Sequence, residues 1–222
     1  MVLFEIGAVK NPRTFLPTGL FNIRSFEPVN YYLIDQGYEQ VISMTQEGEI
    51  THFSVTRESD QNGVSNSYTF SLVSAVPILQ SEILILTFPP DFHLSNSECQ
   101  NPSTPISCTV IGQTLKSVAL DPLSTLTFTL TNVRNPISLK PSEPFTDVRF
   151  STPAGYPISK LYAPSAVLTN TAANTFISPK LTQYDYDALI ETTYELEFKP
   201  SSHLPRTASL LIKYPDSIVL GS

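Results

Sequence analysis

Apolar and polar side chains alternate with a period of two along much of this chain. Between residues 124 and 133, Leu126, Phe128 and Leu130 fall on one face and threonines fall on the other. This alternation predicts a half-buried antiparallel strand with its apolar face toward a core. The segment 82–88 is apolar on both faces, which is typical of a central strand. Further strands are predicted at 50–56, 67–74, 148–152 and 194–198.

The spacing of these strands indicates the fold class. Short strands separated by Pro, Gly, Asn and Ser, at intervals near ten residues, are typical of a β-sandwich. The chain has 222 residues, enough for one or two domains with a substantial core. The sequence therefore predicts an all-β protein built from antiparallel, immunoglobulin-like sandwiches.

A proline-containing motif occurs twice. FEIGAVKNPRTFLPTGLF begins at residue 4, and FTLTNVRNPISLKPSEPF begins at residue 128. The two stretches match at a shift of 124 residues, and Lys10 and Arg134 also match in charge. The identical pairs are Phe4 and Phe128, Val9 and Val133, Asn11 and Asn135, Pro12 and Pro136, Pro17 and Pro141, and Phe21 and Phe145.

A second block of the sequence repeats at a shift of 126 residues. The matched positions are Tyr68, Phe70, Leu72, Leu84, Leu86, Phe88 and Pro89, with Tyr194, Leu196, Phe198, Leu210, Ile212, Tyr214 and Pro215. Because two separate blocks agree on nearly the same period, we interpret the chain as a tandem array of repeats of about 125 residues.

This period predicts the domain organisation. Residues 66–190 form one complete sandwich repeat, 1–65 form the C-terminal part of the repeat before it, and 191–222 supply the first strands of the next. Half a sandwich exposes its apolar face and its strand edges, so the flanking pieces need a partner. That partner is either an adjacent repeat of a longer chain or a separate copy, whose half-domain the strands of 191–222 would complete. Either source gives a linear array.

The repeated motif has a predicted structural role. A strand ends at Val9 or Val133, and the Asn-Pro that follows excludes helical backbone at the preceding residue. The later proline stiffens the chain, and Phe21 or Phe145 anchors the next strand. We expect the motif to form the crossing between the two sheets of a sandwich.

The two cysteines, Cys99 and Cys108, lie in the stretch SECQNPSTPISC. Free thiols are the alternative, but no neighbouring histidine or further cysteine is available to build a metal site. We expect a disulfide, which would stabilise the fold by roughly 2–3 kcal/mol. A disulfide is typical of extracellular proteins.

Charge and composition exclude several classes of protein. The net charge is −7 and no lysine or arginine cluster is present, which argues against nucleic-acid binding. The longest apolar run, at 83–86, is far too short to span a membrane. Serine and threonine make up about a fifth of the chain, a surface suited to O-linked glycans.

Candidate chemistry is sparse. His52, His93 and His203 have no metal-binding spacing, and no nucleophile elbow, phosphate-binding glycine loop or dinucleotide fingerprint is present. We therefore expect no enzymatic activity and no cofactor.

Acidic clusters near the repeat boundaries offer weak calcium candidates. Asp60, Asn62, Asp185 and Asp187 could supply part of a calcium shell, which needs six to eight oxygens. The simpler interpretation, which we prefer, is a tight turn at Asn62 with solvated aspartates.

Five tyrosines raise the alternative of an adhesin-like or carbohydrate-binding module. An exposed aromatic platform can stack on sugars, although packing between domains is the preferred interpretation. The tyrosines are Tyr31, Tyr32, Tyr38, Tyr184 and Tyr186.

The order of motifs resembles a known kind of protein. A Y-x-F-x-[LF] strand, an apolar strand ending in Phe-Pro or Tyr-Pro, a two-cysteine hairpin and V-[KR]-N-P…P…F together resemble the large tandem-repeat surface proteins of ciliate-type protists. Those proteins are strings of immunoglobulin-like or cadherin-like sandwiches. The resemblance implies a structural component of an extracellular fibre or cell-surface coat, with copies of itself or adjacent repeats as partners.

Overall fold

The computed structural model describes residues 3, 5–100, 106–163, 166–187, 191–201, 204, 206–216 and 218. These residues form strands and connecting loops without helices, which confirms the all-β class and the strands predicted from alternation. The strands are β1 (Phe21–Phe26), β2 (Leu33–Gln40), β3 (Gly48–Arg57), β4 (Ser65–Ile78), β5 (Ile83–Thr87), β6 (Glu98–Gln100), β7 (Ile106–Ile111), β8 (Thr114–Ala119), β9 (Leu123–Arg134), β10 (Val148–Ser151), β11 (Pro157–Lys160), β12 (Phe176–Gln183) and β13 (Tyr194–Pro200).

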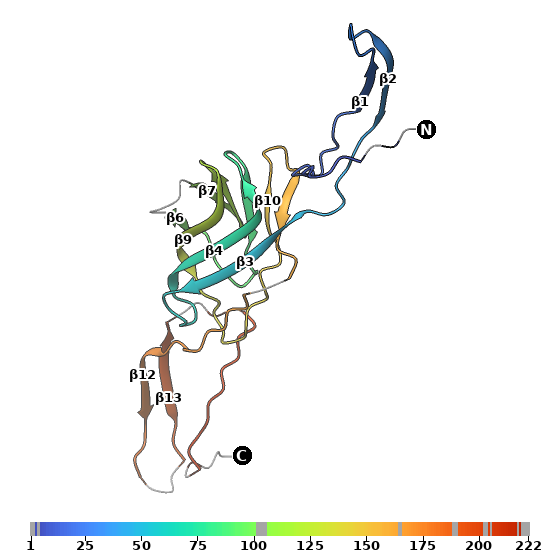
Figure 1. Ribbon diagram of the computed structural model, residues 1–222. Coiled ribbons are helices and arrows are strands. Elements are labelled where there is room, and N and C mark those ends of the chain that lie inside the picture. The colour runs from blue at the N-terminus through green and yellow to red at the C-terminus, as the bar shows by residue number, and fades with distance from the viewer. Residues whose placement is uncertain are drawn as a thin grey trace.

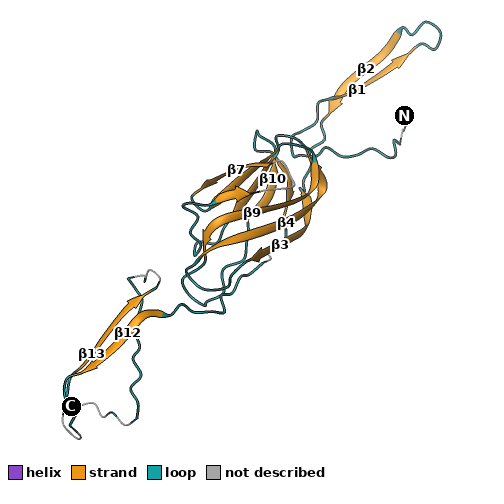
Figure 2. Ribbon diagram, turned by 90° about the vertical axis from the view of Figure 1, so that its left-hand side faces the viewer, coloured by secondary structure: helices purple, strands orange, loops and turns teal. Residues whose placement is uncertain are grey.

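Nine of these strands form one sheet that curls into a nearly closed barrel (Figures 1 and 2). The strand order is β6-β9-β4-β3-β11-β10-β5-β8-β7. The sequence predicted two separate antiparallel sheets, and two antiparallel halves are indeed present, β6-β9-β4-β3 and β11-β10-β5-β8-β7. A short parallel ladder, Ser159 with Gly48 and Lys160 with Glu49, joins them into one mixed sheet.

Gly48 permits this join because it lacks a side chain. A Cβ atom at this position would lie 2.9 Å from the carbonyl oxygen of Ile158 and would collide with the side chain of Val76. Next to it, the buried hydroxyls of Ser74 and Ser159 are 3.0 Å apart. The two halves therefore meet at a contact that only glycine fits.

The opposite ends of the sheet are joined covalently. Cys99 lies in β6 and Cys108 in β7, the two edge strands, and the predicted disulfide links them with a Cα–Cα distance of 6.2 Å. An open sheet exposes unpaired backbone groups at its edges. The disulfide thus closes the barrel where hydrogen bonding between strands ends.

A cluster of phenylalanines fills the barrel. Phe70 of β4 stacks on Phe128 of β9 with ring centroids 5.1 Å apart, and the two residues are cross-strand partners. Phe88 and Phe145 pack edge-on against Phe70 at 5.5 and 6.1 Å. Edge-to-face and offset pairs of this kind add to the free energy of apolar burial. The predicted inward face of β9 is buried as expected, and its threonines point outward.

Two hairpins project from opposite sides of the barrel (Figures 1 and 2). One is β1–β2, and the other is β12–β13, followed by the described residues 204 and 206–216. Large apolar side chains on both hairpins are exposed, among them Ile23 at 72% and Leu181 at 62%. The described part of the chain contains no helix of the length and hydropathy needed to cross a membrane.

The register of β12–β13 repeats that of β3–β4 at a shift of 126 residues. In the barrel Val55 pairs with Phe70, and in the hairpin Leu181 pairs with Leu196. The same shift relates four further pairs: Ile50–Ser74 with Phe176–Pro200, Ser54–Ser71 with Lys180–Glu197, Thr56–Thr69 with Thr182–Glu195, and Arg57–Tyr68 with Gln183–Tyr194.

The β1–β2 hairpin likewise repeats the register of β10–β11. The shift is 125 residues in the first strand and 124 in the second, and a bulge falls at the same place in both hairpins. The matched pairs are Arg149–Lys160 with Arg24–Gln36, Phe150–Ser159 with Ser25–Asp35, and Ser151–Pro157 with Phe26–Leu33.

Candidate functional site

The second copy of the repeated motif lies where the chain crosses from β9 in one half of the barrel to β10 in the other. Asn135, Pro136 and Phe145 are buried there, and Pro141 is exposed. Phe145 contacts Phe53, Phe70, Phe88 and Phe92. The motif thus combines an aromatic core residue with a buried polar one.

Asn135 fills the loop between β3 and β4. Its side-chain amide donates hydrogen bonds to the backbone oxygens of Ser59 at 3.1 Å and Gln61 at 2.7 Å. Its side-chain oxygen accepts a hydrogen bond from the hydroxyl of Tyr68, and its backbone N–H donates to Val64 at 2.9 Å. Because buried polar groups need partners, Asn135 and this loop stabilise each other. The sequence indicated that Asn135 recurs but gave no sign of these partners, which lie about seventy residues away.

Burial raises the pKa of Tyr68 above its ordinary value, although Arg57 nearby acts in the opposite direction. The phenol therefore stays protonated at neutral pH and is available as a donor to Asn135. Buried Asn66 also donates a hydrogen bond to the Asn135 side-chain oxygen at 3.4 Å, so the three residues form a buried polar cluster.

The loop that receives Asn135 has a counterpart in the β12–β13 hairpin. The described residues 184–187 and 191–193 make the same kind of internal hydrogen bonds as their counterparts in the loop of residues 58–67, again at a shift of 126 residues. The matched bonds are Glu58 N to Ser67 O (3.3 Å) with Tyr184 N to Thr193 O (3.2 Å), Ser59 N to Asn66 Oδ1 (3.2 Å) with Asp185 N to Thr192 Oγ1 (2.8 Å), and Gln61 N to Ser59 Oγ (3.3 Å) with Asp187 N to Asp185 Oδ1 (3.0 Å). We call the described residues of this counterpart, 184–187 and 191–193, the receptor loop.

The first copy of the motif lies on the other side of the barrel from the receptor loop (Figures 1 and 2). Asn11 and Pro17 are exposed, Pro12 is half-buried, and Phe21 is 49% exposed. The same residue types that are mostly buried in the second copy therefore face solvent in the first.

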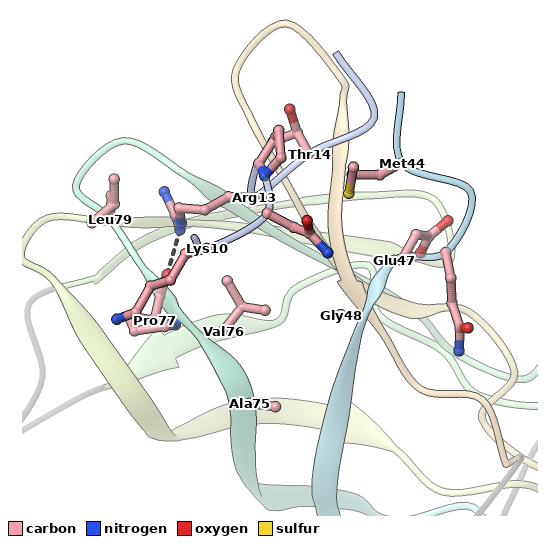
Figure 3. A pocket seen from close by; sticks show the side chains of 13 residues that line it. Lys10, Arg13, Thr14, Met44, Glu47, Gly48, Ala75, Val76, Pro77 and Leu79 are labelled. Atoms are coloured by element: carbon pink, nitrogen blue, oxygen red, sulfur yellow. Dashed lines mark hydrogen bonds between the residues drawn. The ribbon is translucent and has the colours of Figure 1, made fainter. Parts of the chain in front are cut away.

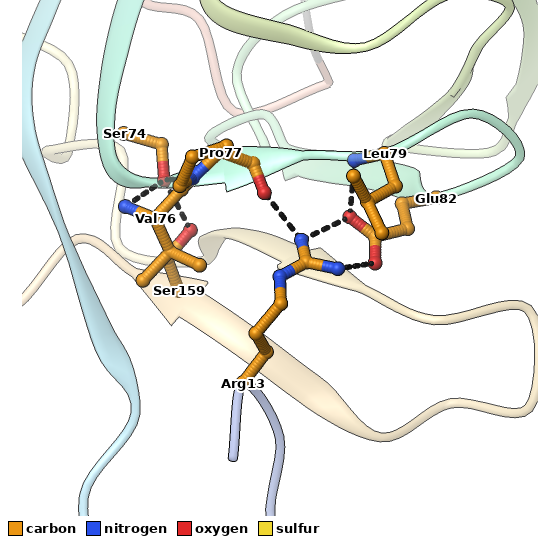
Figure 4. A network of polar contacts seen from close by, with 7 residues as sticks. All are labelled: Arg13, Ser74, Val76, Pro77, Leu79, Glu82 and Ser159. Carbon is orange, nitrogen blue, oxygen red and sulfur yellow. Dashed lines mark hydrogen bonds and ion pairs between the residues drawn. The ribbon is translucent and has the colours of Figure 1, made fainter. Parts of the chain in front are cut away.

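Arg13 fixes this first copy to the barrel (Figure 4). Its guanidinium donates to both carboxylate oxygens of Glu82 at 2.9 Å and to the carbonyl of Pro77. Glu82 is buried and also accepts a hydrogen bond from the N–H of Leu79 at 2.7 Å. A bidentate pair of this kind sets orientation as well as proximity. Residues 10–14 are thus held against the end of β4.

A cavity of about 600 Å³ lies beside this contact (Figure 3). It is bounded by the first motif, the connection from β2 to β3 and the end of β4. One carboxylate oxygen of Glu47, Oε2, is buried there and accepts no hydrogen bond from any residue that the structure describes. The lining residues are Lys10, Asn11, Pro12, Arg13, Thr14, Met44, Gln46, Glu47, Gly48, Ala75, Val76, Pro77 and Leu79. Because the lining residues come from both the N-terminal segment and the barrel, the cavity lies at the junction of these two parts.

The residues considered as calcium ligands fall into the two matching loops. Asp60 accepts a hydrogen bond from Thr171, while the Asn62 side chain donates to Ile137 and accepts from Asn174 N at 2.7 Å. Asp185 and Asp187 lie in the receptor loop, where they bond to each other. Within the described residues no group of three or more His, Cys, Asp and Glu side chains is placed to hold a metal ion.

The histidines and tyrosines are dispersed. His52 lies on β3 and His93 forms a bridge with Arg134, while His203 is outside the described residues. Tyr31 and Tyr32 lie at the turn of β1–β2, and Tyr184 and Tyr186 lie on the opposite hairpin. These four exposed tyrosines therefore do not share a surface.

Comparison with known proteins adds no relative: no protein-family model matches the chain, and no curated protein matches it significantly.

Proposed function

We propose that this protein is a structural link in an extracellular fibre or cell-surface coat, built from tandem β-repeats of about 125 residues joined head to tail. The observation that carries the proposal is the duplicated geometry. Each flanking hairpin has the strand register of a hairpin in the barrel, yet exposes the apolar side chains that the barrel buries. Exposed apolar faces of this extent are typical of surfaces that bind a protein partner.

The extracellular setting rests on the disulfide and on composition. Disulfides persist in oxidising compartments and are rare in the cytosol. The serine- and threonine-rich surface suits O-linked glycans, and the negative net charge argues against a nucleic-acid partner. The resemblance to tandem-repeat surface proteins of protists agrees with this setting. The proposed role is mechanical and involves no catalysis.

The proposal is tested by following the size of the secreted protein over a range of concentrations. Light scattering and negative-stain electron microscopy should reveal linear polymers that lengthen as concentration rises. Leu196→Asp, on the β13 face, should shorten or abolish the polymers because it places a charge on the proposed interface. Leu120→Asp is a matched control, since Leu120 is 43% exposed on the barrel and Leu196 is 41% exposed. A folded protein that stays monomeric at every concentration contradicts the fibre role.

A further inference from the structure

We infer that Asn11 of one copy docks into the receptor loop of a second copy, as Asn135 docks into the loop of residues 58–67 within the barrel. The β12–β13 hairpin of one copy and the N-terminal half of the next then form a composite barrel. This inference rests on the proposed fibre function and specifies its contact.

Three internal hydrogen bonds of the receptor loop match those of the loop that holds Asn135, so we infer that it can hold an asparagine in the same way. Asn135 bonds to the backbone oxygens of Ser59 and Gln61, whose counterparts at a shift of 126 are those of Asp185 and Asp187. The Asp185 oxygen also accepts a hydrogen bond from the Gln183 side chain, just as the Ser59 oxygen accepts a second one from Asn66. Backbone acceptors do not depend on side-chain identity, so the change of residue type preserves them. The hydroxyl partner is preserved too, because Tyr194 takes the place of Tyr68 and is 37% exposed.

The strand pairs of the barrel specify the register of the composite. The pairing of Tyr68 with Leu130 and Thr69 with Thr129 predicts that Tyr194 meets Ile6 and Glu195 meets Glu5. The pairing of β5 with β10 predicts that Ile212 meets Ile23. The parallel ladder between β11 and β3 predicts that β2 of one copy lies beside the start of β12 of the other.

The side chains brought together by this register are apolar and exposed in a single copy. In the barrel, the corresponding residues are almost completely buried. The exposed set is Ile6, Val9, Ile23, Phe26, Tyr194, Leu196, Leu210 and Ile212. Burial of apolar surface is the main driving force for association of this kind.

We assign the contact to a second copy, because the first motif and the receptor loop of these 222 residues cannot reach each other. The first motif and the receptor loop lie on opposite sides of the barrel (Figures 1 and 2), and Arg13 holds the first motif to Glu82. The contact joins two different surfaces, so it is heterologous and propagates as a linear array. Completion of a sheet by strands from another chain is an established mode of protein association.

A double-mutant cycle on self-association tests the hydrogen bond between Asn11 and Tyr194. Tyr194→Phe should weaken association about fivefold and Asn11→Ala about tenfold or more, because Asn11 also bonds to two carbonyls; the two together should weaken it little more than Asn11→Ala alone. Asn30→Ala, an exposed residue of the same hairpin region, should have no effect. Full additivity of the two substitutions, or no effect of either, overturns the inference.

Disulfide trapping tests the register independently. The hydroxyls of Thr69 and Thr129 are 3.0 Å apart in the barrel, so cysteines at their counterparts should lie within bonding reach across copies. Mixed chains carrying Glu5→Cys and Glu195→Cys should cross-link on mild oxidation, whereas Glu5→Cys with Glu191→Cys should not. Polymers that form without this cross-link contradict the docking geometry but leave the fibre role intact. A protein that does not polymerise contradicts both.

Discussion

The hydroxyl of Tyr68 donates a hydrogen bond to the side chain of Asn135, which is 67 residues away in sequence and completely buried. The pair connects β4 to the crossing between the two halves of the barrel. Both residues recur, Tyr68 as Tyr194 and Asn135 as Asn11. Tyr194 begins β13, whereas Asn11 belongs to the N-terminal segment, which lies on the other side of the barrel from that hairpin (Figure 1). The Tyr68–Asn135 contact stabilises the barrel, and the equivalent contact between Tyr194 and Asn11 is the one that we propose joins two copies.

Asn135→Ala should destabilise the barrel by about 3 kcal/mol, because it leaves buried carbonyls and the Tyr68 hydroxyl without partners. Urea unfolding followed by circular dichroism measures the change. Asn30→Ala serves as the exposed control and should fall within about 0.5 kcal/mol of the wild type. A similarly small effect at Asn135 would falsify its structural role.

Alkaline pH should destabilise the barrel through Tyr68. Its pKa in the folded state lies above the ordinary value of 10.0, because burial disfavours the phenolate. Because the folded state favours the neutral phenol, its protonation stabilises the barrel fully below pH 10.0. This stabilisation is lost as the pH rises through the folded-state pKa. The free energy of unfolding of Tyr68→Phe should depend less on pH above this point. If the unfolding free energies of the wild type and Tyr68→Phe depended equally on pH above 10.0, the raised pKa of Tyr68 would be contradicted.

Replacing Cys99 and Cys108 together by serine should cost about 2–3 kcal/mol of stability. The disulfide links the two edge strands, so its loss also frees the edges β6 and β7. We expect a lower melting temperature by calorimetry and faster aggregation on heating. Treatment of the wild type with a reducing agent should give the same result, and an unchanged melting temperature in both cases would contradict it.

Gly48→Ala should destabilise the barrel by about 1–3 kcal/mol through overpacking against Val76 and Ile158. Gly37→Ala is the matched control, because a Cβ atom there meets nothing within 4 Å. Chemical denaturation of the two variants measures the difference. Equal stabilities would show that the joint between β3 and β11 can relax.

Glu5→Lys should tighten self-association about fivefold. The composite barrel places Glu5 opposite Glu195, and like charges directly across a strand pair are unfavourable whereas opposite charges attract. Adding Glu195→Lys to the same chain should reverse the gain, and salt should reduce both effects. Sedimentation measurements in low and high salt follow the change, and no response to either substitution would argue against this register.

Much of the fold was accessible from the pattern of residues. Alternation placed the inward face of β9 correctly, since Leu126, Phe128 and Leu130 are all buried. The spacing of Cys99 and Cys108 indicated the disulfide correctly. Pairing of distant strands was not accessible, because alternation shows which face of a strand is buried but not which strand lies beside it. For this reason the sequence did not show that β3 pairs with β4 and belongs to the barrel, although β3 precedes the repeat boundary predicted at residue 66.

The sequence by itself determined the all-β class, the main strands, the disulfide and the recurrence of the Asn-Pro motif. These properties depend on side-chain periodicity and on local backbone chemistry, which a single chain segment carries. The tertiary structure alone decided that the two halves join through Gly48, that the disulfide closes the barrel, and that Asn135 fills the loop of residues 58–67. Those contacts join residues far apart in the chain, and they exist only once the strands have packed around a common core.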